Sequence, residues 1–573
     1  MKTVTAIVLV FTLGALAQAE DDCVLAMTES GLVCGARMKA TNGEDFVSFM
    51  GMRYAKAPIG ELRFAEPQSP EPYDGIFDAT TPGLVCPQLT DKLLPDLPAP
   101  PQGEDCLRVN VHVPLSAVPQ NSSDWDNPRL PVFVYIHGGS FITGSGNPDT
   151  YGPEYLMQKG IILVTINYRL ASIGFLSLDS EYIPGNAGLR DALFALKWVK
   201  RNIELFGGDP DEITLGGQSA GGAISHLVSI SPAVKGLGLF KRGIFMSGNA
   251  LANFYTTSPI SAKNVSALFL KAMGISSAIF KSPKSIHQEL IKAPIEKILE
   301  ANQYVYNKAG LALTFCPVQE KPQKGFTTML PKDPEVLLKE GYGKEIASIF
   351  GFTNNECQVF KPFMIKGNLE KVLQTSQVAI VPQNLLFTSN VLTIPVLTRE
   401  IKSEYYNGTT PTLEKYLYEC TDAFYKYPVM RIADKRLESG AEPTFVYEFG
   451  YHGEDSVIKA AVKSDWPGAG HGEDVTYFFR VNWFLGPSKV DELAQSNPDS
   501  KMKEWMTTFI ANFVRTGDPA SIPAEWLPTN QQFEFQSIEE PMEYKLQLIT
   551  PYLRDKKKFW NKLYKIGRVD LFR

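Results

Sequence analysis

The chain has 573 residues, of which 44% are hydrophobic and 21% are charged. This is the composition of a globular protein, and it excludes a disordered, collagen-like or coiled-coil chain. The 56 Lys and Arg residues against 62 Asp and Glu residues give a net charge of -6, which argues against nucleic acid as a partner. The sequence contains no periodic repeat of the kind that builds solenoids or propellers. We therefore expect residues 20–573 to form one domain.

Residues 1–19 have the pattern of a secretory signal peptide. Lys2 precedes an apolar run from Val4 to Leu16, which ends in the small-residue pattern Ala17-Gln18-Ala19. The run has about 13 residues, too few to cross a bilayer, and the pattern that follows is typical of a signal peptidase cleavage site. We predict a secreted, extracellular protein without a membrane anchor, whose mature chain begins near Glu20.

Secretion makes the cysteines and the glycosylation sequons informative. The seven cysteines are Cys23, Cys34, Cys86, Cys106, Cys316, Cys357 and Cys420. In an oxidising compartment they can pair, and an odd number leaves one over unless it pairs between chains. Sequons begin at Asn121, Asn264 and Asn407, so we predict N-glycosylation on surface segments at these three positions.

The middle of the chain alternates strand and helix patterns. Residues 130–136 and 161–166 are short β-branched or aromatic runs, typical of buried parallel strands that lie side by side. From residue 188 to residue 203 apolar side chains recur at helical spacing, which predicts a crossover helix. Residues 213–215 form a further short strand pattern, and a helical stretch begins near Ala220.

Between that strand and that helix lies Gly217-Gln-Ser219-Ala-Gly221, a Gly-x-Ser-x-Gly motif. In this context the motif is typical of a nucleophile elbow, where a sharp turn exposes the serine and the two glycines let strand and helix approach closely. We therefore predict that Ser219 is a catalytic nucleophile.

A serine nucleophile needs a base, which in this arrangement follows it in the chain. The six histidines are His112, His137, His226, His287, His452 and His471. The first two precede the serine, the third lies just inside the helix that starts at it, and the fourth lies in a Lys- and Ser-rich segment. His471 lies in a glycine-rich loop after a predicted strand over residues 445–449, and we favour it over His452 as the base.

The acid that orients the base should end another strand between serine and histidine. Residues 346–352 form such a strand pattern, and Glu356 follows shortly after its end. We predict that Glu356 holds the tautomer of the catalytic histidine and stabilises its charged form. The alternative is a solvated loop carboxylate.

The tetrahedral oxyanion that forms when a serine attacks a carbonyl group needs backbone N–H donors. His137-Gly138-Gly139 follows the predicted strand over residues 130–136 directly, and glycine lets the backbone of such a loop approach the reacting atoms. We predict that the N–H groups of Gly138, Gly139 and Ala220 form the oxyanion hole. The alternative for the glycine pair is a simple turn.

These motifs together resemble the type-B carboxylesterase family, whose members have an α/β-hydrolase fold. Matching segments are residues 51–58 (GMRYAKAP), 104–107 (EDCL), 167–170 (NYRL), 185–191 (GNAGLRD), 206–210 (FGGDP) and 559–560 (FW). The resemblance implies an α/β fold, with a central, mostly parallel sheet flanked by helices and with large loop and helical insertions. It also implies a catalytic triad of Ser219, Glu356 and His471.

The resemblance implies further contacts around this triad. They are a disulfide between Cys86 and Cys106, buried ion pairs Arg63–Glu104 and Arg169–Asp191, and Ser247 as a supporting residue behind the triad. No metal or cofactor is implied, and no cluster of His, Cys and carboxylate residues has metal-ligand spacing.

Two features favour a neutral substrate over a cationic one. Residues 87–105 contain no aromatic residue, although cholinesterases of this family bind a quaternary ammonium on a tryptophan in the corresponding loop. The residue before the nucleophile is the neutral Gln218, where that branch has a carboxylate. Gly468-x-x-His471-x-x-Asp474 and the elbow motif are similar to those of the juvenile hormone esterase branch, which usually has Asp-Gln where this chain has Asp191-Ala192.

The sequence therefore predicts a secreted serine carboxylesterase that hydrolyses small, neutral, hydrophobic esters through an acyl-enzyme on Ser219. A juvenile hormone methyl ester is one candidate substrate. A general or odorant-degrading carboxylesterase is the alternative, and a non-catalytic adhesion or binding homologue is the second. The sequence does not indicate an oligomeric state.

Overall fold

The computed structural model describes the chain except for residues 1–22, 90–98, 121–126, 253, 276–280, 310–314, 454–455, 483–485, 487–496, 521–525, 542–544 and 568–573. The predicted signal peptide and the sequon at Asn121 lie outside the described residues.

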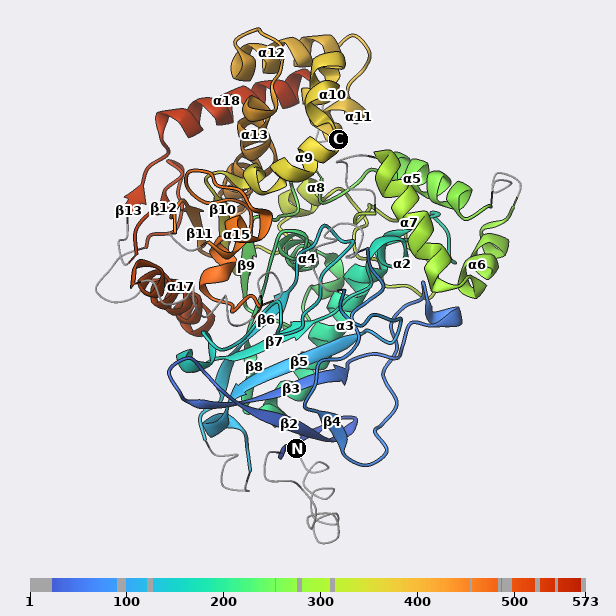
Figure 1. The fold of residues 1–573 in the computed structure, drawn as a ribbon, viewed down its shortest axis with the longest axis vertical. Coiled ribbons are helices and arrows are strands. Elements are labelled where there is room, and N and C mark those ends of the chain that lie inside the picture. The colour runs from blue at the N-terminus through green and yellow to red at the C-terminus, as the bar shows by residue number, and fades with distance from the viewer. Residues whose placement is uncertain are drawn as a thin grey trace.

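A mixed β-sheet runs through the molecule (Figure 1). Its strands are β1 (Cys23–Thr28), β2 (Gly31–Lys39), β3 (Asp45–Arg53), β4 (Phe77–Ala79), β5 (Arg108–Pro114), β6 (Leu130–Ile136), β7 (Ile162–Ile166), β8 (Gly208–Gln218), β9 (Arg242–Met246), β10 (Ala347–Thr353), β11 (Thr444–Phe449), β12 (Phe535–Ile538) and β13 (Lys545–Gln547). Their order is β1-β2-β3-β5-β7-β6-β8-β9-β10-β11-β12-β13, and β4 pairs with β2. From β7 through β6 to β12 all neighbours are parallel. The pairs at the two ends of the sheet are antiparallel, except that β4 pairs with β2 in parallel.

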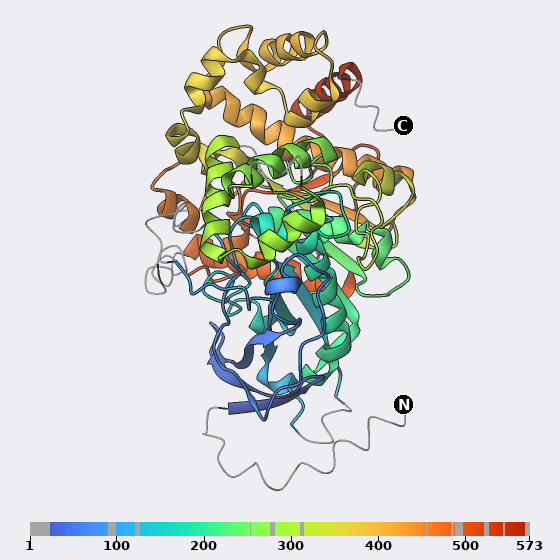
Figure 2. The same cartoon turned by 90° about the vertical axis from the view of Figure 1, so that its right-hand side faces the viewer.

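Helices cover both faces of this sheet and form a helical region beyond its edge (Figures 1 and 2). The α-helices are α2 (Ala171–Phe175), α3 (Ala187–Asn202), α4 (Ala220–Ser229), α5 (Pro259–Ala272), α6 (Pro283–Lys292), α7 (Ile295–Ala309), α8 (Pro334–Lys339), α9 (Lys361–Lys366), α10 (Leu369–Thr375), α11 (Gln383–Thr388), α12 (Ile394–Tyr406), α13 (Leu413–Thr421), α14 (Tyr427–Glu438), α15 (Val457–Val462), α17 (Asn497–Thr516) and α18 (Pro551–Ile566). The mostly parallel sheet, the flanking helices and the large helical insertions confirm the predicted fold class.

The predicted elements of the central region are present. The strands expected over residues 130–136 and 161–166 are β6 and β7, which pair in parallel, and the expected crossover helix is α3. One strand is longer than expected, because β8 extends from Gly208 to Gln218 rather than over residues 213–215. Its first residues pair with β6 through an irregular register, in which Leu130 lies opposite Gly208 and Val132 opposite Ile213. This long-range pairing has no counterpart in the local pattern.

The alternation of side chains along β6 divides the core into two layers. Val132, Val134 and Ile136 belong to the cluster that packs against α3 and α4, whereas Phe133 and Tyr135 belong to the cluster that packs against α17. A central strand that is buried on both faces has this continuous apolar sequence. Packing on both faces fixes the position of the strands, so side chains at the carboxyl ends of the strands are well positioned.

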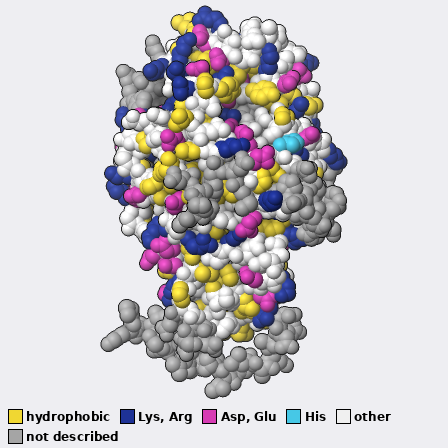
Figure 3. Space-filling model, turned by 90° about the vertical axis from the view of Figure 1, so that its left-hand side faces the viewer, with side chains coloured by type: hydrophobic (Ala, Val, Ile, Leu, Met, Phe, Trp, Pro, Cys, Tyr) yellow, Lys and Arg dark blue, Asp and Glu magenta, His cyan; other side chains and the backbone are white. Residues whose placement is uncertain are grey.

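The last helix is tied to the helical insertion by ion pairs. Three lysines of α18 lie within 2.8 Å of carboxylates: Lys556 with Glu404, Lys557 with Asp434 and Lys562 with Glu400. On the face drawn in Figure 3, the described Lys and Arg side chains are interspersed with Asp and Glu side chains. The three lysine–carboxylate pairs of α18 neutralise much of the positive charge near the carboxyl terminus of the described chain.

Six of the seven cysteines form disulfides, namely Cys23–Cys34, Cys86–Cys106 and Cys357–Cys420. Cys316 is unpaired and buried. Two of the predicted glycosylation sites, Asn264 on α5 and Asn407 at the end of α12, are exposed. Within the described part of the chain, no helix is both long enough and apolar enough to cross a membrane.

Candidate active site

The predicted site residues gather at one edge of the sheet, because each of them follows the carboxyl end of a strand. The glycine loop follows β6, Ser219 follows β8, Ser247 follows β9, Glu356 follows β10, and His471 lies beyond β11. In parallel sheets the carboxyl ends of the strands form the usual binding edge. The fold thus brings together residues that lie far apart in the sequence.

Ser219 lies at a strained turn between β8 and α4. Its backbone angles are φ 59° and ψ -129°, and its N–H donates to the carbonyl of Met246 at 2.8 Å. Such a conformation costs a non-glycine residue roughly 1–3 kcal/mol, so the surrounding structure must enforce it. A Cβ atom on Gly221 would lie 2.0 Å from the carbonyl oxygen of Ile136, which shows why this turn requires glycine. The Gly-x-Ser-x-Gly segment has the geometry of a nucleophile elbow.

Glu356 and His471 contact each other twice. His471 Nδ1 lies 2.7 Å from Glu356 Oε2, and the backbone N–H of His471 donates to the backbone carbonyl of Glu356 at 3.1 Å. The Glu356 side chain is fully buried. A carboxylate only accepts hydrogen bonds, so His471 Nδ1 carries the proton and Nε2 of the neutral ring is left as an acceptor. This is the tautomer that a general base requires.

The second carboxylate oxygen of Glu356 is also held. It accepts hydrogen bonds from the Ser247 hydroxyl and from the backbone N–H of Thr353, both at 2.7 Å. The next residue, Cys357, forms its disulfide with Cys420 at the end of α13. The sequence left the partner of Cys357 open, and the structure pairs it so that the disulfide anchors the turn that carries Glu356.

The hydroxyl of Ser219 lies 3.1 Å from the hydroxyl of Tyr255, in the segment after β9. Among the hydrogen bonds of the described residues, none joins Ser219 to His471. His471 Nε2 lies instead 3.1 Å from the side-chain amide nitrogen of Gln218. Sequence reasoning missed both contacts. Gln218 adjoins the nucleophile and could have been suspected, but no local pattern marks Tyr255.

His452, the alternative base, lies away from this arrangement. It is exposed, and its Nδ1 lies 2.7 Å from the Lys459 ammonium, which donates to it. The structure therefore places His471, and not His452, against Glu356.

The glycine loop after β6 lies against the nucleophile. A Cβ on Gly138 would lie 3.0 Å from the Cβ of Ser219. Gly139 has φ 106°, and the following Ser140 and Phe141 also have positive φ values of 56° and 62°, so the chain turns sharply here. Ala220 is the first residue of α4, where the N–H has no acceptor within the helix. Backbone donors from two segments thus adjoin Ser219.

His137 and Tyr151 support this loop. His137 is buried, and its Nδ1 lies 2.7 Å from the carbonyl of Gly138 and donates to it, while its ring stacks on Tyr168. Burial lowers the pKa of His137 to about 4, so the ring is neutral at physiological pH. Burial also raises the pKa of Tyr151 to about 12, and the neighbouring backbone N–H of Gly138 opposes that rise.

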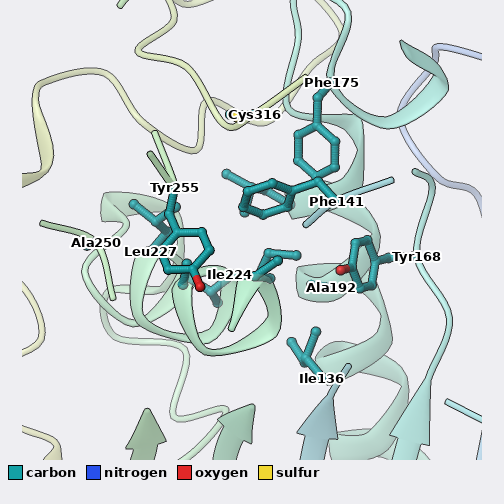
Figure 4. Packing of buried hydrophobic residues seen from close by; sticks show 14 of the residues in the cluster. Ile136, Phe141, Tyr168, Phe175, Ala192, Ile224, Leu227, Ala250, Tyr255 and Cys316 are labelled. Carbon is teal, nitrogen blue, oxygen red and sulfur yellow. The ribbon is translucent and has the colours of Figure 1, made fainter. Parts of the chain in front are cut away.

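Aromatic rings surround the site. Phe360 and Tyr425 lie 5.3 Å and 5.1 Å from the ring of His471, measured between centroids. Tyr425 belongs to a π-helical turn (Asp422–Lys426) between α13 and α14, a local distortion often found at functional sites. On the other side, Phe141 packs against Tyr255 beside residues of α4 (Figure 4). The surroundings of Ser219 are therefore largely apolar.

Behind the site, charged groups are paired. Arg63 contacts Glu104 at 2.7 Å, and the fully buried Arg169 contacts Asp191 at 2.6 Å, as the resemblance implied. Among the residues that the structure describes, no group of three or more His, Cys, Asp or Glu side chains is placed to hold a metal ion.

Comparisons with known proteins agree on one family. The carboxylesterase family profile matches residues 22–560. The juvenile hormone esterase of Heliothis virescens is 41% identical over 522 residues, which cover 90% of each chain, and that of Tribolium castaneum is 31% identical, covering 86% of this chain and 84% of its own. The crystal structure of the juvenile hormone esterase of Manduca sexta, with OTFP covalently attached, is similar with a TM-score of 0.88 and 40% identity, covering 95% of this chain and 100% of its own. The chain belongs to the carboxylesterase family and is a serine carboxylic ester hydrolase with an α/β-hydrolase fold.

Proposed function

We propose that this protein is a secreted enzyme that hydrolyses neutral hydrophobic esters, a juvenile hormone methyl ester among them, and that Ser219, His471 and Glu356 carry the reaction. The observation that carries the assignment is the contact of 2.7 Å between the buried Glu356 and His471, beside a strained Ser219. A histidine held by a carboxylate next to an elbow serine is the arrangement that activates a hydroxyl as a nucleophile.

The proposed reaction has two halves. His471 Nε2 takes the proton of Ser219 as its oxygen attacks the ester carbonyl, and the N–H groups of Gly138, Gly139 and Ala220 stabilise the oxyanion. His471 then gives that proton to the leaving alcohol, and an acyl-enzyme remains. In the second half water attacks the acyl group in the same way, and Ser219 recovers its proton as the acid leaves. Apart from the ester and the water, every group in this scheme belongs to the chain.

The surroundings of the triad support a neutral, hydrophobic substrate. The rings of Phe141, Tyr255, Phe360 and Tyr425 lie around the reacting groups. The residue before the nucleophile is the uncharged Gln218, which removes one attraction for a cation. Two relatives and the structural neighbour named above are juvenile hormone esterases. We therefore place juvenile hormone first among candidate substrates.

Extracellular localisation rests on two supporting features. Residues 1–19 have the signal-peptide pattern, and the described chain contains three disulfides, which persist in oxidising compartments.

A general carboxylesterase is the second candidate, and Ala192 is the observation that favours it. This residue stands where the juvenile hormone esterase branch usually has glutamine, and it is fully buried on α3 beside Asp191. The helix is therefore packed around a smaller side chain at this position than that branch would carry.

The test is the kcat/KM of the secreted protein for juvenile hormone and for a short ester such as naphthyl acetate, with Ser219→Ala as the blank. We expect a strong preference for the hormone. Good turnover of the short ester with poor turnover of the hormone would establish the general carboxylesterase instead. If wild type and Ser219→Ala hydrolysed both esters equally, the assignment of Ser219 would be wrong.

A further inference from the structure

The hydroxyl of Tyr255 links the nucleophile to the backbone. It lies 3.1 Å from Ser219 Oγ and donates to the carbonyl of Ser247 at 3.0 Å. A phenol has one proton, and a carbonyl oxygen can only accept. Because Tyr255 gives its proton to Ser247, the hydrogen bond to Ser219 must run the other way. The hydroxyl proton of Ser219 is thus directed at the Tyr255 oxygen.

His471 Nε2, the atom that must accept this proton in catalysis, already accepts another hydrogen bond. His471 Nδ1 donates to Glu356, so the lone pair of the ring is on Nε2, and the amide N–H of Gln218 points to it at 3.1 Å. The two groups that must exchange a proton are therefore each bonded to a different neighbour. In this state Ser219 is not activated, because activation requires the serine hydroxyl to bond the base.

We propose that Tyr255 holds the Ser219 hydroxyl away from His471 in the free enzyme, so that the bond between nucleophile and base forms only when an ester enters the site. This inference rests on the proposed role of Ser219 and extends it. The change from resting to reactive state is a rotation of the Ser219 side chain. In this rotation the Ser219 hydroxyl breaks its hydrogen bond to the Tyr255 oxygen and forms one to His471 Nε2. The hydrogen bond from the Gln218 amide to His471 Nε2 breaks as well. No covalent bond changes.

Tyr255 is suited to this role because it is firmly placed and stays neutral. Its side chain is buried, with 1% of its surface exposed, and it contacts the rings of Phe141 and Phe254. Burial raises the pKa of Tyr255, which the hydrogen bond with Ser219 only partly offsets. A neutral phenol accepts a hydrogen bond but is too weak a base to take the serine proton. Tyr255 therefore competes with His471 for the orientation of the hydroxyl and not for the proton.

The proposed role of Tyr255 predicts that its loss raises kcat/KM, whereas the loss of a purely structural tyrosine would lower kcat/KM or leave it unchanged. Removing the phenol oxygen in Tyr255→Phe leaves Ser219 without its resting partner, so a larger fraction of the free enzyme has the serine bonded to His471. We expect kcat/KM to rise roughly two- to tenfold, the range that one neutral hydrogen bond spans.

The experiment uses the full-length secreted protein and two readouts, namely the rate constant for phosphorylation of Ser219 by a small organophosphate and kcat/KM for naphthyl acetate from pH 5 to pH 9. The matched control is Tyr54→Phe, which removes a buried hydroxyl that likewise donates to a backbone carbonyl, that of Asn167, at 2.7 Å. We expect both rates to rise in Tyr255→Phe by the same factor across this pH range, and not to rise in Tyr54→Phe. Unchanged or lower rates in Tyr255→Phe would overturn the proposal.

A crystal structure of the free wild-type enzyme provides a readout that needs no variant. Ser219 Oγ within hydrogen-bond distance of the Tyr255 hydroxyl supports the proposal, and Ser219 Oγ bonded to His471 Nε2 overturns it. The failure of the proposed function is a separate result: wild-type protein that the organophosphate does not label at Ser219 would refute the role of Ser219 itself. A labelled wild type with an unresponsive Tyr255→Phe would refute only the role of Tyr255.

Discussion

The acid–base side and the nucleophile side of the candidate site differ in how far their side chains are preorganised for reaction. On the acid–base side, both oxygens of Glu356 and Nδ1 of His471 are held in the arrangement that catalysis requires, and a disulfide anchors the turn beside them. On the nucleophile side, Ser219 has the backbone of an elbow, but its hydroxyl is bonded to Tyr255. Within one site, the base can thus be fully preorganised, while the nucleophile is oriented only when an ester enters.

The largest expected effect comes from breaking the acid–base side. In Glu356→Gln the amide can present its N–H to His471, which would favour the wrong tautomer of the ring. We expect kcat to fall by about ten-thousand-fold, as when the acid of a serine triad is replaced by its amide. Steady-state hydrolysis of naphthyl acetate measures this, with Ser219→Ala as the floor. A fall of less than about tenfold would show that Glu356 does not orient the base.

A smaller effect is expected from removing the disulfide beside Glu356. The double variant Cys357→Ser with Cys420→Ser opens a loop whose ends are 63 residues apart. We expect stability to fall by about 2–4 kcal/mol and kcat to fall as well, because the turn that carries Glu356 is less constrained. Thermal unfolding and kcat are measured together.

The control is Cys23→Ser with Cys34→Ser, which removes a disulfide between β1 and β2 at the edge of the sheet. We expect this variant to lose stability with an unchanged kcat. Equal losses of kcat in both double variants would contradict a specific role for the Cys357–Cys420 disulfide.

Ser247→Ala sharpens the comparison, because it removes one of the two hydrogen bonds to Glu356 Oε1 and leaves the one from Thr353. A hydrogen bond to a charged group contributes about 1.5–3 kcal/mol, and the remaining bond compensates in part. We expect kcat for naphthyl acetate to fall roughly tenfold. Ser48→Ala, which removes a buried hydroxyl bonded to His112, should leave kcat unchanged.

The smallest expected effect concerns a group outside the site. Burial lowers the pKa of His112 on β5 from 6.5 to about 3, so the folded protein keeps this ring neutral. Its contribution to stability is present above pH 6.5 and is lost as the pH falls from 6.5 towards 3. The expected slope is about 1.4 kcal/mol per pH unit within that window.

Unfolding midpoints of wild type and His112→Gln between pH 4 and pH 8 measure this contribution. We expect the variant to lose less stability than the wild type as the solution becomes acidic. Parallel pH dependences of the two proteins would show that the unfolded state and the folded state bind the His112 proton equally.

Much of the fold and the framework of the site follow from local sequence patterns. The runs that form β6, β7 and β10 are apolar because these strands are buried on both faces, and the elbow motif marks Ser219 because a tight turn demands glycine. Contacts that depend on long-range packing leave no such pattern. Tyr255 meets Ser219 across 36 residues, and Cys357 meets Cys420 across 63, so neither pairing can be derived from spacing alone. The full length of β8 depends likewise on its pairing with β6.

The measurement that tests the central claim most directly is the mass of the protein after reaction with a serine-directed organophosphate, followed by peptide mapping. The account predicts one phosphoryl adduct, located on Ser219, formed together with the loss of esterase activity and absent in Ser219→Ala. An adduct on another residue that abolishes activity, or full activity in Ser219→Ala, would contradict it.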